Sequence, residues 1–120
     1  ILVKKYINQK YNTKVIGCPI IRDKNKVALS SRNFLLNKND LHLASKIIKN
    51  LFKFKNKFRK SKNINYLLKI KKLELQNKYK IKIEYLENRK VKNFEKIDNF
   101  NRSKIFIAYY INQVRLIDNL

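Results

Sequence analysis

Cysteine, glycine and proline each occur once in this sequence of 120 residues, and methionine and tryptophan are absent. The single cysteine, Cys18, excludes a disulfide framework, and an unpaired thiol is typical of a reducing compartment. The longest uninterrupted apolar run, residues 105–111, has seven residues, well short of the roughly 18 that a membrane-spanning helix needs. The first residues do not follow the pattern of a signal peptide. We therefore expect a cytoplasmic protein that makes no membrane contact.

Acidic side chains are also scarce: 8 aspartates and glutamates stand against 30 lysines and arginines, which gives a net charge of +22. Such an excess often indicates a polyanionic partner, since lysine and arginine displace counterions from phosphate backbones. Here lysine outnumbers arginine 24 to 6, whereas phosphate sites favour the planar fork of arginine. Lysine, asparagine and isoleucine make up almost half of the chain, which is typical of a drift towards A/T-rich codons. We therefore do not expect nucleic acid as the partner, and a basic nucleic-acid-binding module is the alternative hypothesis.

The first part of the chain contains a predicted helix, strand and loop. Apolar residues recur with the period of a helix over residues 1–12. A short buried strand is predicted over residues 13–20, and it ends at Pro19. Residues 21–33 follow neither period, so we expect a long loop, and loops of that length in compact domains often carry function.

Two helices are predicted next. Asn37 and Asp40 have the spacing of an N-cap residue and an acid at the third helical position, so a long helix should begin there and run to about Arg59. A second helix is predicted over residues 64–77, where the aliphatic stem of Lys71 joins the apolar face. The apolar stripe of the first helix consists of Leu43, Ile47, Ile48, Leu51, Phe52 and Phe58.

Beyond these helices the apolar period changes to two. Apolar residues at 81, 83 and 85 alternate with charged ones, which is typical of a strand, and a polar stretch follows over residues 87–103. Residues 105–111 predict a strand that is covered on both faces or nearly so. Asn112 suits the positive φ of a hairpin turn into residues 114–119. Helices followed by strands predict one α+β unit.

The predicted loop offers donors for phosphate oxygens. Residues 28–33 read Ala-Leu-Ser-Ser-Arg-Asn and supply hydroxyl, guanidinium, amide and backbone N–H groups. From this chemistry alone, an ordinary polar loop that caps the next helix is the favoured interpretation. Cys18 and His42 are the only thiol and imidazole, and two structural residues are favoured over a catalytic pair. We expect no metal site formed by protein side chains, because no ligand spacing is present.

Together with its flanks, the loop resembles the pantoate–β-alanine ligases. Residues 17–23 stand where this family has Gly-x-Pro-x-x-Arg-Glu, and residues 28–33 stand, at matching spacing, where it has Ala-Met-Ser-Ser-Arg-Asn. Residues 36–40 correspond to Leu-Ser-Pro-Glu-Glu, residues 84–87 to a Tyr-Leu-Glu strand, and residues 114–119 to Thr-Arg-Leu-Ile-Asp-Asn. The order and spacing of these motifs agree over nearly the whole chain.

The resemblance implies an activity. Such a ligase joins pantoate to β-alanine with ATP and Mg²⁺, through a pantoyl adenylate, and releases AMP and pyrophosphate. It also implies an α/β family fold: residues 1–20 would be the last helix and strand of a Rossmann-like nucleotide-binding domain. Residues 21–120 would form an ATP-contacting loop and a small C-terminal closing domain, with helices against a three-stranded antiparallel sheet. The complete enzyme would be a homodimer.

Site residues are implied by the same resemblance. Arg32, Ser30 and Ser31 correspond to family residues that contact ATP, and we expect them to stabilise charge on the phosphates. Leu29 is expected to pack against the adenine or to close the loop through its backbone. Ile21 stands at a position where the family contacts the nucleotide through its backbone. These five residues form the candidate nucleotide site.

Two residues of the motif have either a structural or a functional role, and two other positions depart from the family pattern. Arg22 and Asn33 match the motif, and a structural role at the ends of the loop is as well supported as a functional one. Asn25 and Lys26 replace the usual Asp-Gly, and we expect Asn25 to adopt the conformation that the glycine would take. The family's His-x-Gly-His and Lys-Asp-x-Gln-Gln segments would precede Ile1, so we expect residues 1–120 alone to be inactive.

Overall fold

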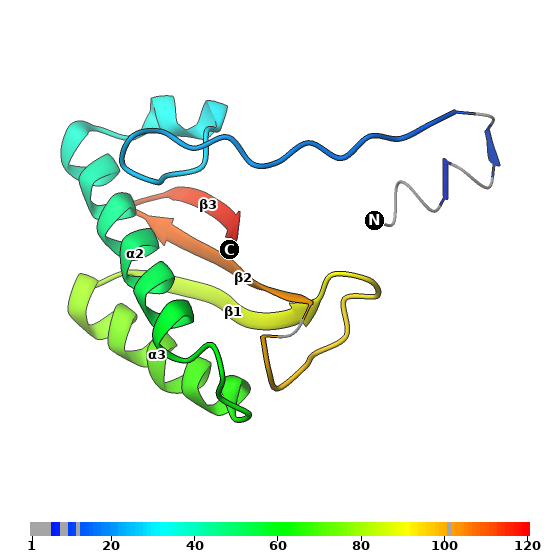
Figure 1. Ribbon diagram of the computed structural model, residues 1–120. Coiled ribbons are helices and arrows are strands. Elements are labelled where there is room, and N and C mark those ends of the chain that lie inside the picture. Colours follow the sequence, from blue (N-terminus) through cyan, green and yellow to red (C-terminus); the bar gives the residue numbers. More distant parts are fainter. Residues whose placement is uncertain (1–5, 8–9, 12, 101) are drawn as a thin grey trace.

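The computed structural model describes residues 6–7, 10–11, 13–100 and 102–120. Two helices pack on one face of a three-stranded antiparallel sheet of order β1-β2-β3 (Figure 1). This arrangement confirms the predicted α+β unit. In chain order the elements are the 3₁₀ helix η1 (Ser31–Leu35), α2 (Lys38–Lys57), α3 (Ile64–Tyr79), β1 (Lys82–Lys90), β2 (Ser103–Ile111) and β3 (Val114–Asn119).

Helix α2 begins with the predicted cap. The Asp40 backbone N–H donates to Asn37 Oδ1 at 2.9 Å, and the Asn37 N–H donates to Asp40 Oδ2 at 3.3 Å. This reciprocal pair satisfies two of the N–H groups that a helix start leaves free. The apolar stripe differs from the prediction: Phe54 is buried, whereas Leu43, Phe52 and Phe58 are only partly buried against the core.

Helix α3 runs two residues further than predicted and ends at Tyr79, after which Lys80 has a positive φ of 53°. Ile64, Leu68 and Leu75 are buried against the sheet and α2. The Lys71 side chain is only 11% exposed, and its ammonium contacts both Glu74, at 2.8 Å, and the ring of Phe54, at 5.8 Å from the centroid. The predicted burial of the Lys71 stem is confirmed.

Strand β1 is longer than predicted. It continues to Lys90 instead of giving way to a polar stretch at residue 87, because it pairs with β2 along its length. A shift in register between Ile83 and Tyr85 interrupts the alternation, as a β-bulge does. Ile83, Leu86 and Asn88 consequently face the helices, and Tyr85 lies on the opposite face of the sheet.

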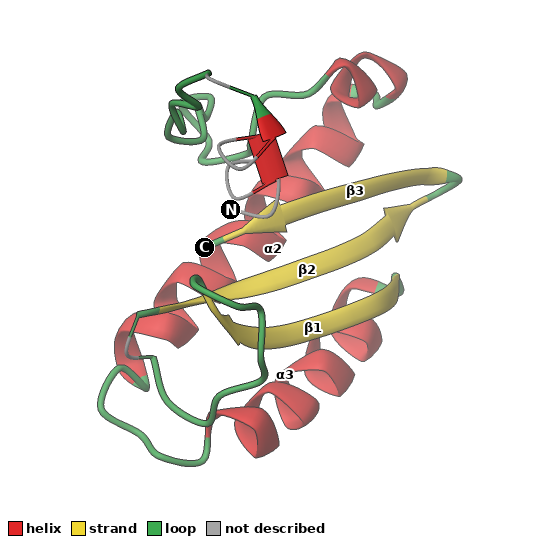
Figure 2. Ribbon diagram, turned by 90° about the vertical axis from the view of Figure 1, so that its right-hand side faces the viewer, coloured by secondary structure: helices red, strands yellow, loops and turns green. Residues whose placement is uncertain are grey.

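Strands β2 and β3 form the predicted hairpin. Asn112 adopts a φ of 52° in its turn, which confirms the expected conformation. On the helix side of β2, Ile105, Ile107, Tyr109 and Ile111 are almost fully buried. Figure 2 shows α2 and α3 together behind the sheet. The other face is less covered than predicted, because Phe106 and Tyr110 are only half-buried there.

The strand predicted over residues 13–20 is not formed. These residues belong to no strand, and Ile16 is 74% exposed. Figure 1 shows the segment running away from the sheet, and a strand needs a neighbouring strand to satisfy its backbone groups. Of the helix predicted over residues 1–12, Tyr6, Ile7 and Lys10 are helical, and residues 1–5, 8–9 and 12 lie outside the described residues.

Candidate functional site

The loop before η1 is a small hairpin. Arg22 and Ala28 form an isolated antiparallel bridge, and the Leu29 N–H donates to the Ile21 carbonyl at 3.0 Å. Inside it, the Asp23 N–H donates to the Val27 carbonyl at 2.9 Å. Val27 is 4% exposed and belongs to the core. The segment that the sequence indicated only as a long loop therefore has a defined, anchored shape.

The tip of this hairpin corrects one expectation. Lys26, not Asn25, has the positive φ, at 72°. This position corresponds to the glycine of the family's Asp-Gly pair, and the left-handed conformation costs a non-glycine residue about 1–2 kcal/mol. The Asp23 carboxylate holds the turn by accepting from the backbone N–H groups of Asn25 and Val27, at 2.8 and 2.9 Å. Ser45 of α2 also donates to the Asn25 carbonyl at 2.9 Å.

Arg22 has a structural position. Its Nη1 and Nη2 donate to the two Asp118 carboxylate oxygens at 2.6 and 2.8 Å. The same guanidinium donates to the carbonyls of Asn119 and Lys26, at 3.0 and 2.9 Å, and lies 5.3 Å from the centroid of the Phe52 ring. Of the two roles left open for Arg22, these contacts support the structural one.

Helix η1 presents the Ser-Ser-Arg-Asn residues. Ser30 is its N-cap, and its hydroxyl oxygen accepts from the Arg32 backbone N–H at 3.2 Å. The Asn33 side chain donates to the Ala28 carbonyl at 3.0 Å, so Asn33 holds the two ends of the segment together. Ser31 begins η1 and is exposed. The N-cap and first turn of this short helix therefore hold Ser30, Ser31 and Arg32 at the surface.

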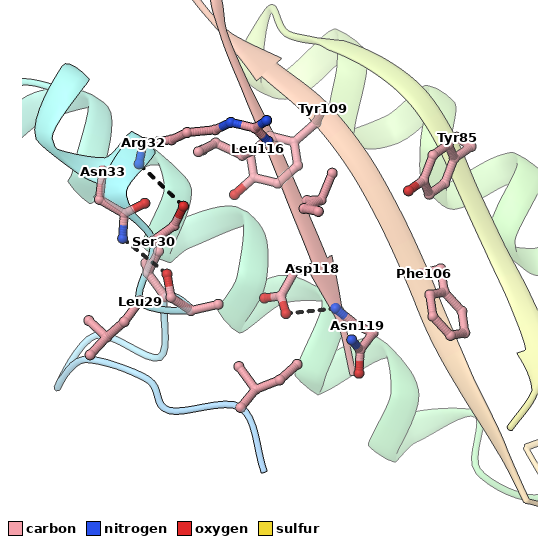
Figure 3. A pocket seen from close by; sticks show the side chains of 14 residues that line it. Leu29, Ser30, Arg32, Asn33, Tyr85, Phe106, Tyr109, Leu116, Asp118 and Asn119 are labelled. Atoms are coloured by element: carbon pink, nitrogen blue, oxygen red, sulfur yellow. Dashed lines mark hydrogen bonds between the residues drawn. The ribbon is translucent and has the colours of Figure 1, made fainter. Parts of the chain in front are cut away.

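A hollow of about 440 Å³ lies between this segment and the three-stranded sheet (Figure 3). Of the five candidate nucleotide-site residues, Leu29, Ser30 and Arg32 line it. Ser31 and Ile21 do not, and Ile21 is 69% exposed with its carbonyl already paired to Leu29. The lining consists of Ile20, Val27, Ala28, Leu29, Ser30, Arg32, Asn33, Tyr85, Phe106, Tyr109, Leu116, Ile117, Asp118 and Asn119.

Arg32 is held weakly. Its Nη1 donates to the Arg115 carbonyl across a long 3.4 Å, and the residue is exposed. Figure 3 shows its side chain reaching from η1 towards β3. Among the described residues, the Arg32 guanidinium makes one long hydrogen bond. An anion that enters the hollow could replace this bond with shorter, stronger charge-assisted ones.

The apolar wall of the hollow was not predicted. Tyr85 lies there because the β1 bulge moves it to the open face of the sheet, where Phe106 also lies. The alternation of residues 81, 83 and 85 predicted that all three side chains share one face, and nothing in the sequence indicated the bulge between Ile83 and Tyr85. Tyr109 is almost fully buried, and burial raises the pKa of its phenol well above the usual range, with the Asp118 charge adding to the effect and Arg22 opposing it. The phenol is therefore neutral at physiological pH.

Two further properties describe the same part of the chain. Within residues 6–7, 10–11, 13–100 and 102–120, no group of three or more His, Cys, Asp or Glu side chains is placed to hold a metal ion. The helices of these residues include none that is long and apolar enough to span a membrane. Asp118, the carboxylate in the lining of the hollow, already accepts from Arg22.

The fold and the hollow define a small α+β domain with a loop suited to bind anionic oxygens. The family model described as pantoate-beta-alanine ligase matches residues 1–120. The chain therefore belongs to the pantoate–β-alanine ligase family. The resemblance of its motifs to that family is confirmed.

Individual relatives agree with this assignment. The chain is 34% identical to the pantothenate synthetase of Ruthia magnifica and 32% identical to that of Ruminiclostridium cellulolyticum, and it spans 43% of the length of each. A crystal structure of the Francisella tularensis pantoate-beta-alanine ligase complexed with beta-gamma ATP and beta-alanine is 32% identical, with a TM-score of 0.67, over 99% of this chain and 38% of that one. The pantothenate synthetase of Thermus thermophilus is 21% identical and has the same fold, with a TM-score of 0.82, over 98% and 44%. The chain spans less than half the length of these relatives.

Proposed function

We propose that residues 1–120 are the C-terminal part of an enzyme that ligates pantoate to β-alanine with the cleavage of ATP to AMP and pyrophosphate. The observation that carries this proposal is the family match over the whole chain, together with a loop whose phosphate-suited side chains line a hollow. The Francisella relative, at 32% identity, is complexed with beta-gamma ATP and beta-alanine. In this proposal, residues 1–20 end the nucleotide-binding domain, and residues 21–120 form the ATP-facing loop and the closing domain.

The chemistry proceeds in two steps. A carboxylate oxygen of pantoate attacks the α-phosphorus of ATP, and pyrophosphate leaves as the pantoyl adenylate forms. The amine of β-alanine then attacks the acyl carbon, the amide bond forms, and AMP leaves with the bonding electrons of the acyl–oxygen bond. Negative charge builds on the phosphate oxygens in the first step, and preorganised donors there stabilise the transition state.

We assign that stabilisation to Arg32, Ser30 and Ser31. The Arg32 guanidinium has one long hydrogen bond to exchange for phosphate oxygens, and arginine pairs with phosphate through two parallel N–H groups. The Ser30 hydroxyl lines the hollow and would add a contact there. The Ser31 hydroxyl, exposed at the start of η1 and not part of the lining, would contact phosphate oxygens that extend beyond the hollow. Leu29 would pack against the adenine or close the loop, and the backbone of Ile21 would contact the nucleotide.

Mg²⁺ would accompany ATP. It prefers oxygen ligands and is commonly held by substrate phosphates and water, which would leave Arg32 and the serines to the remaining phosphate oxygens. When bound, the ion would neutralise charge on the phosphates. We further propose the homodimer of the resemblance for the complete enzyme and a reducing cytoplasm as its location, and the exposed, unpaired Cys18 supports the latter.

The test uses the complete ligase that carries residues 1–120 as its C-terminal part. Incubation with pantoate, β-alanine and Mg-ATP should yield pantothenate, AMP and pyrophosphate in equal amounts, measured by mass spectrometry. Mg-ATP should also slow amide hydrogen exchange over residues 28–33, with α3 as the internal reference. Absence of pantothenate, or an exchange rate over residues 28–33 that ATP does not change, would contradict the proposal.

A further inference from the structure

We infer that Arg22 and Asp118 are a positioning pair that sets the affinity for ATP. Their ion pair fixes the hairpin of residues 21–29 against β3, and this hairpin leads directly into Ser30 and the start of η1. The inference rests on the proposed function, since it assigns ATP to that loop. Neither residue is assigned contact with the nucleotide.

The pair is built for rigidity. Its two parallel N–H···O bonds, at 2.6 and 2.8 Å, join side chains that are only 15% and 3% exposed. Asp118 Oδ1 also accepts from the Asn119 backbone N–H at 2.7 Å, and the Phe52 ring packs against the guanidinium. A bidentate, partly desolvated pair of this kind fixes orientation as well as distance. Each partner is therefore held in a single geometry.

The other contacts of Arg22 connect the ion pair to the rest of the hairpin of residues 21–29. The same guanidinium that binds Asp118 also binds the carbonyl of Lys26 at the tip of the hairpin, so the tip and β3 share one anchor. The bridge between Arg22 and Ala28 holds the second strand of the hairpin against the first, so Ala28 is fixed relative to Arg22. Leu29 and Ser30 follow Ala28 and line the hollow beside Asp118 and Asn119.

A second ion pair provides a matched control. Arg115 of β3 also makes two bonds to a carboxylate, with Nε and Nη2 at 2.8 and 3.0 Å from the Glu84 oxygens. This pair is more exposed, at 37% and 41%, and joins β3 to β1 across the open face of the sheet. It does not touch the hairpin of residues 21–29. Loss of the Glu84 charge therefore tests the removal of a bidentate pair from β3 without a change in any contact of the hairpin of residues 21–29. The Arg115 carbonyl that accepts from Arg32 belongs to the backbone and is kept in this variant.

The experiment compares Asp118→Asn, Arg22→Lys and their double variant with Glu84→Gln in the complete ligase. Each single variant should raise KM for ATP about tenfold, because the hairpin loses the bidentate, charge-assisted contact that fixes it against β3. KM for β-alanine should stay within twofold. Because the two residues act as one unit, KM for ATP in the double variant should be no higher than in whichever single variant has the higher KM. In Glu84→Gln, KM for ATP and KM for β-alanine should both stay within twofold of wild type.

A merely structural role would give a different result. KM for ATP within twofold of wild type in both single variants, or equal increases in KM for ATP and for β-alanine, would overturn the inference. Should Asp118→Asn fail to fold, Arg22→Lys carries the test, because lysine keeps the charge and an aliphatic stem but loses the fork. An inactive wild-type ligase would refute the proposed function itself, whereas an active one with an unmoved KM for ATP would refute the pair's role alone.

Discussion

Arg22 and Arg32, the two arginines of the segment of residues 21–33, are held in opposite ways. Arg22 is bound by a carboxylate and two carbonyls and is packed on an aromatic ring. Arg32 makes one long hydrogen bond to the Arg115 carbonyl and is exposed. A side chain that is fully engaged stabilises the loop, and one that is loosely held is available to a ligand. The structure thus separates the residue that we expect to shape the site from the one that we expect to act in it.

Arg32→Ala should lower kcat/KM for ATP by about 100-fold or more in the complete ligase, because the variant loses a donor to charge that develops in the transition state. The melting temperature should change little, since Arg32 is exposed and makes one long bond. Steady-state kinetics and thermal unfolding measure the two effects. Arg59→Ala, an exposed arginine beyond the end of α2, is the control and should retain activity. A loss below threefold in Arg32→Ala would contradict the assigned role.

Lys55→Met should raise the melting temperature at neutral pH. Burial lowers the pKa of Lys55, and the positive charges of Lys104 and Arg59 lower it further, so the folded state disfavours the ammonium. The folded pKa lies below the unfolded one, and the destabilisation is therefore present at neutral pH and fades as pH rises through the folded pKa. Methionine keeps an apolar stem beside Phe100, whose ring centroid lies 5.9 Å from the Lys55 nitrogen.

The control for this variant is Lys53→Met, at an exposed position of the same helix. It removes the same formal charge without the desolvation. Thermal unfolding of both variants between pH 7 and pH 10 should show a gain in Lys55→Met that exceeds the gain in Lys53→Met and shrinks at the upper pH. An equal change in the two variants, or a lower melting temperature in Lys55→Met, would rule out desolvation as the cause.

Residue types predicted part of this local geometry. Asn112 was expected in a left-handed turn and adopts it, because asparagine tolerates positive φ. The same preference misplaced the turn at residues 25 and 26, where Lys26 has the positive φ. There the carboxylate of Asp23 and the hydroxyl of Ser45 hold Asn25 in place, and a contact from a helix 20 residues away leaves no signal in a local propensity.

At the scale of elements, the start of α2 connects two parts of the fold. Asp40 completes the capping box with Asn37, and both of its carboxylate oxygens also accept from the Asn112 side chain at 3.1 Å. Asn112 forms the turn between β2 and β3. The helix cap and the hairpin turn are therefore joined by one carboxylate, so the first turn of α2 is fixed relative to the sheet.

Asn37→Ala should destabilise the protein by about 1 kcal/mol, the typical loss when an N-cap side chain is removed. Chemical denaturation of the variant and wild type measures the difference. Asn37→Asp is the control: aspartate caps as well as asparagine and adds a negative charge at the positive end of the helix dipole, so stability should be equal or higher. If Asn37→Ala is as stable as wild type, the cap does not stabilise α2 as described.

The elements that the sequence predicted correctly are those specified by local signals. The start of α2 follows from its cap, and the start of α3 follows from helical periodicity. The hairpin of β2 and β3 follows from an apolar strand and a turn residue. The strand expected over residues 13–20 was wrong, because a strand requires a partner that local sequence does not reveal. The extension of β1 to Lys90 and its bulge likewise depend on pairing with β2.

At the scale of the whole molecule, residues 1–120 alone should form no pantothenate. The chain covers 43% of its relatives' length, and the resemblance places the family's other ATP-binding and pantoate-binding segments before Ile1. The purified chain should therefore give no AMP or pantothenate above background with both substrates and Mg-ATP, measured by mass spectrometry. Activity should return when those residues are supplied on one chain. ATP-dependent pantothenate formation by residues 1–120 alone would contradict this prediction.

The family and the site were predictable from the sequence to different extents. Periodicity correctly predicted a single α+β unit, and the family depended on ordered motifs rather than on the net charge of +22. Neither composition nor periodicity revealed which residues form the hollow, because Tyr85, Phe106 and Asp118 come from three different strands. The site residues from one continuous segment could be named from sequence, whereas the wall opposite them could not.

The ion pair between Arg22 and Asp118 spans 96 residues of sequence, which has a consequence for synthesis. A ribosome that adds about 5–20 residues per second makes Asp118 roughly 5–20 s after Arg22. During that interval the nascent hairpin of residues 21–29 lacks its partner on β3, so it cannot take its final place beside that strand. The ATP site proposed above therefore cannot be anchored before Asp118 has been synthesised, and a nascent chain stalled before Asp118 would carry an unanchored loop.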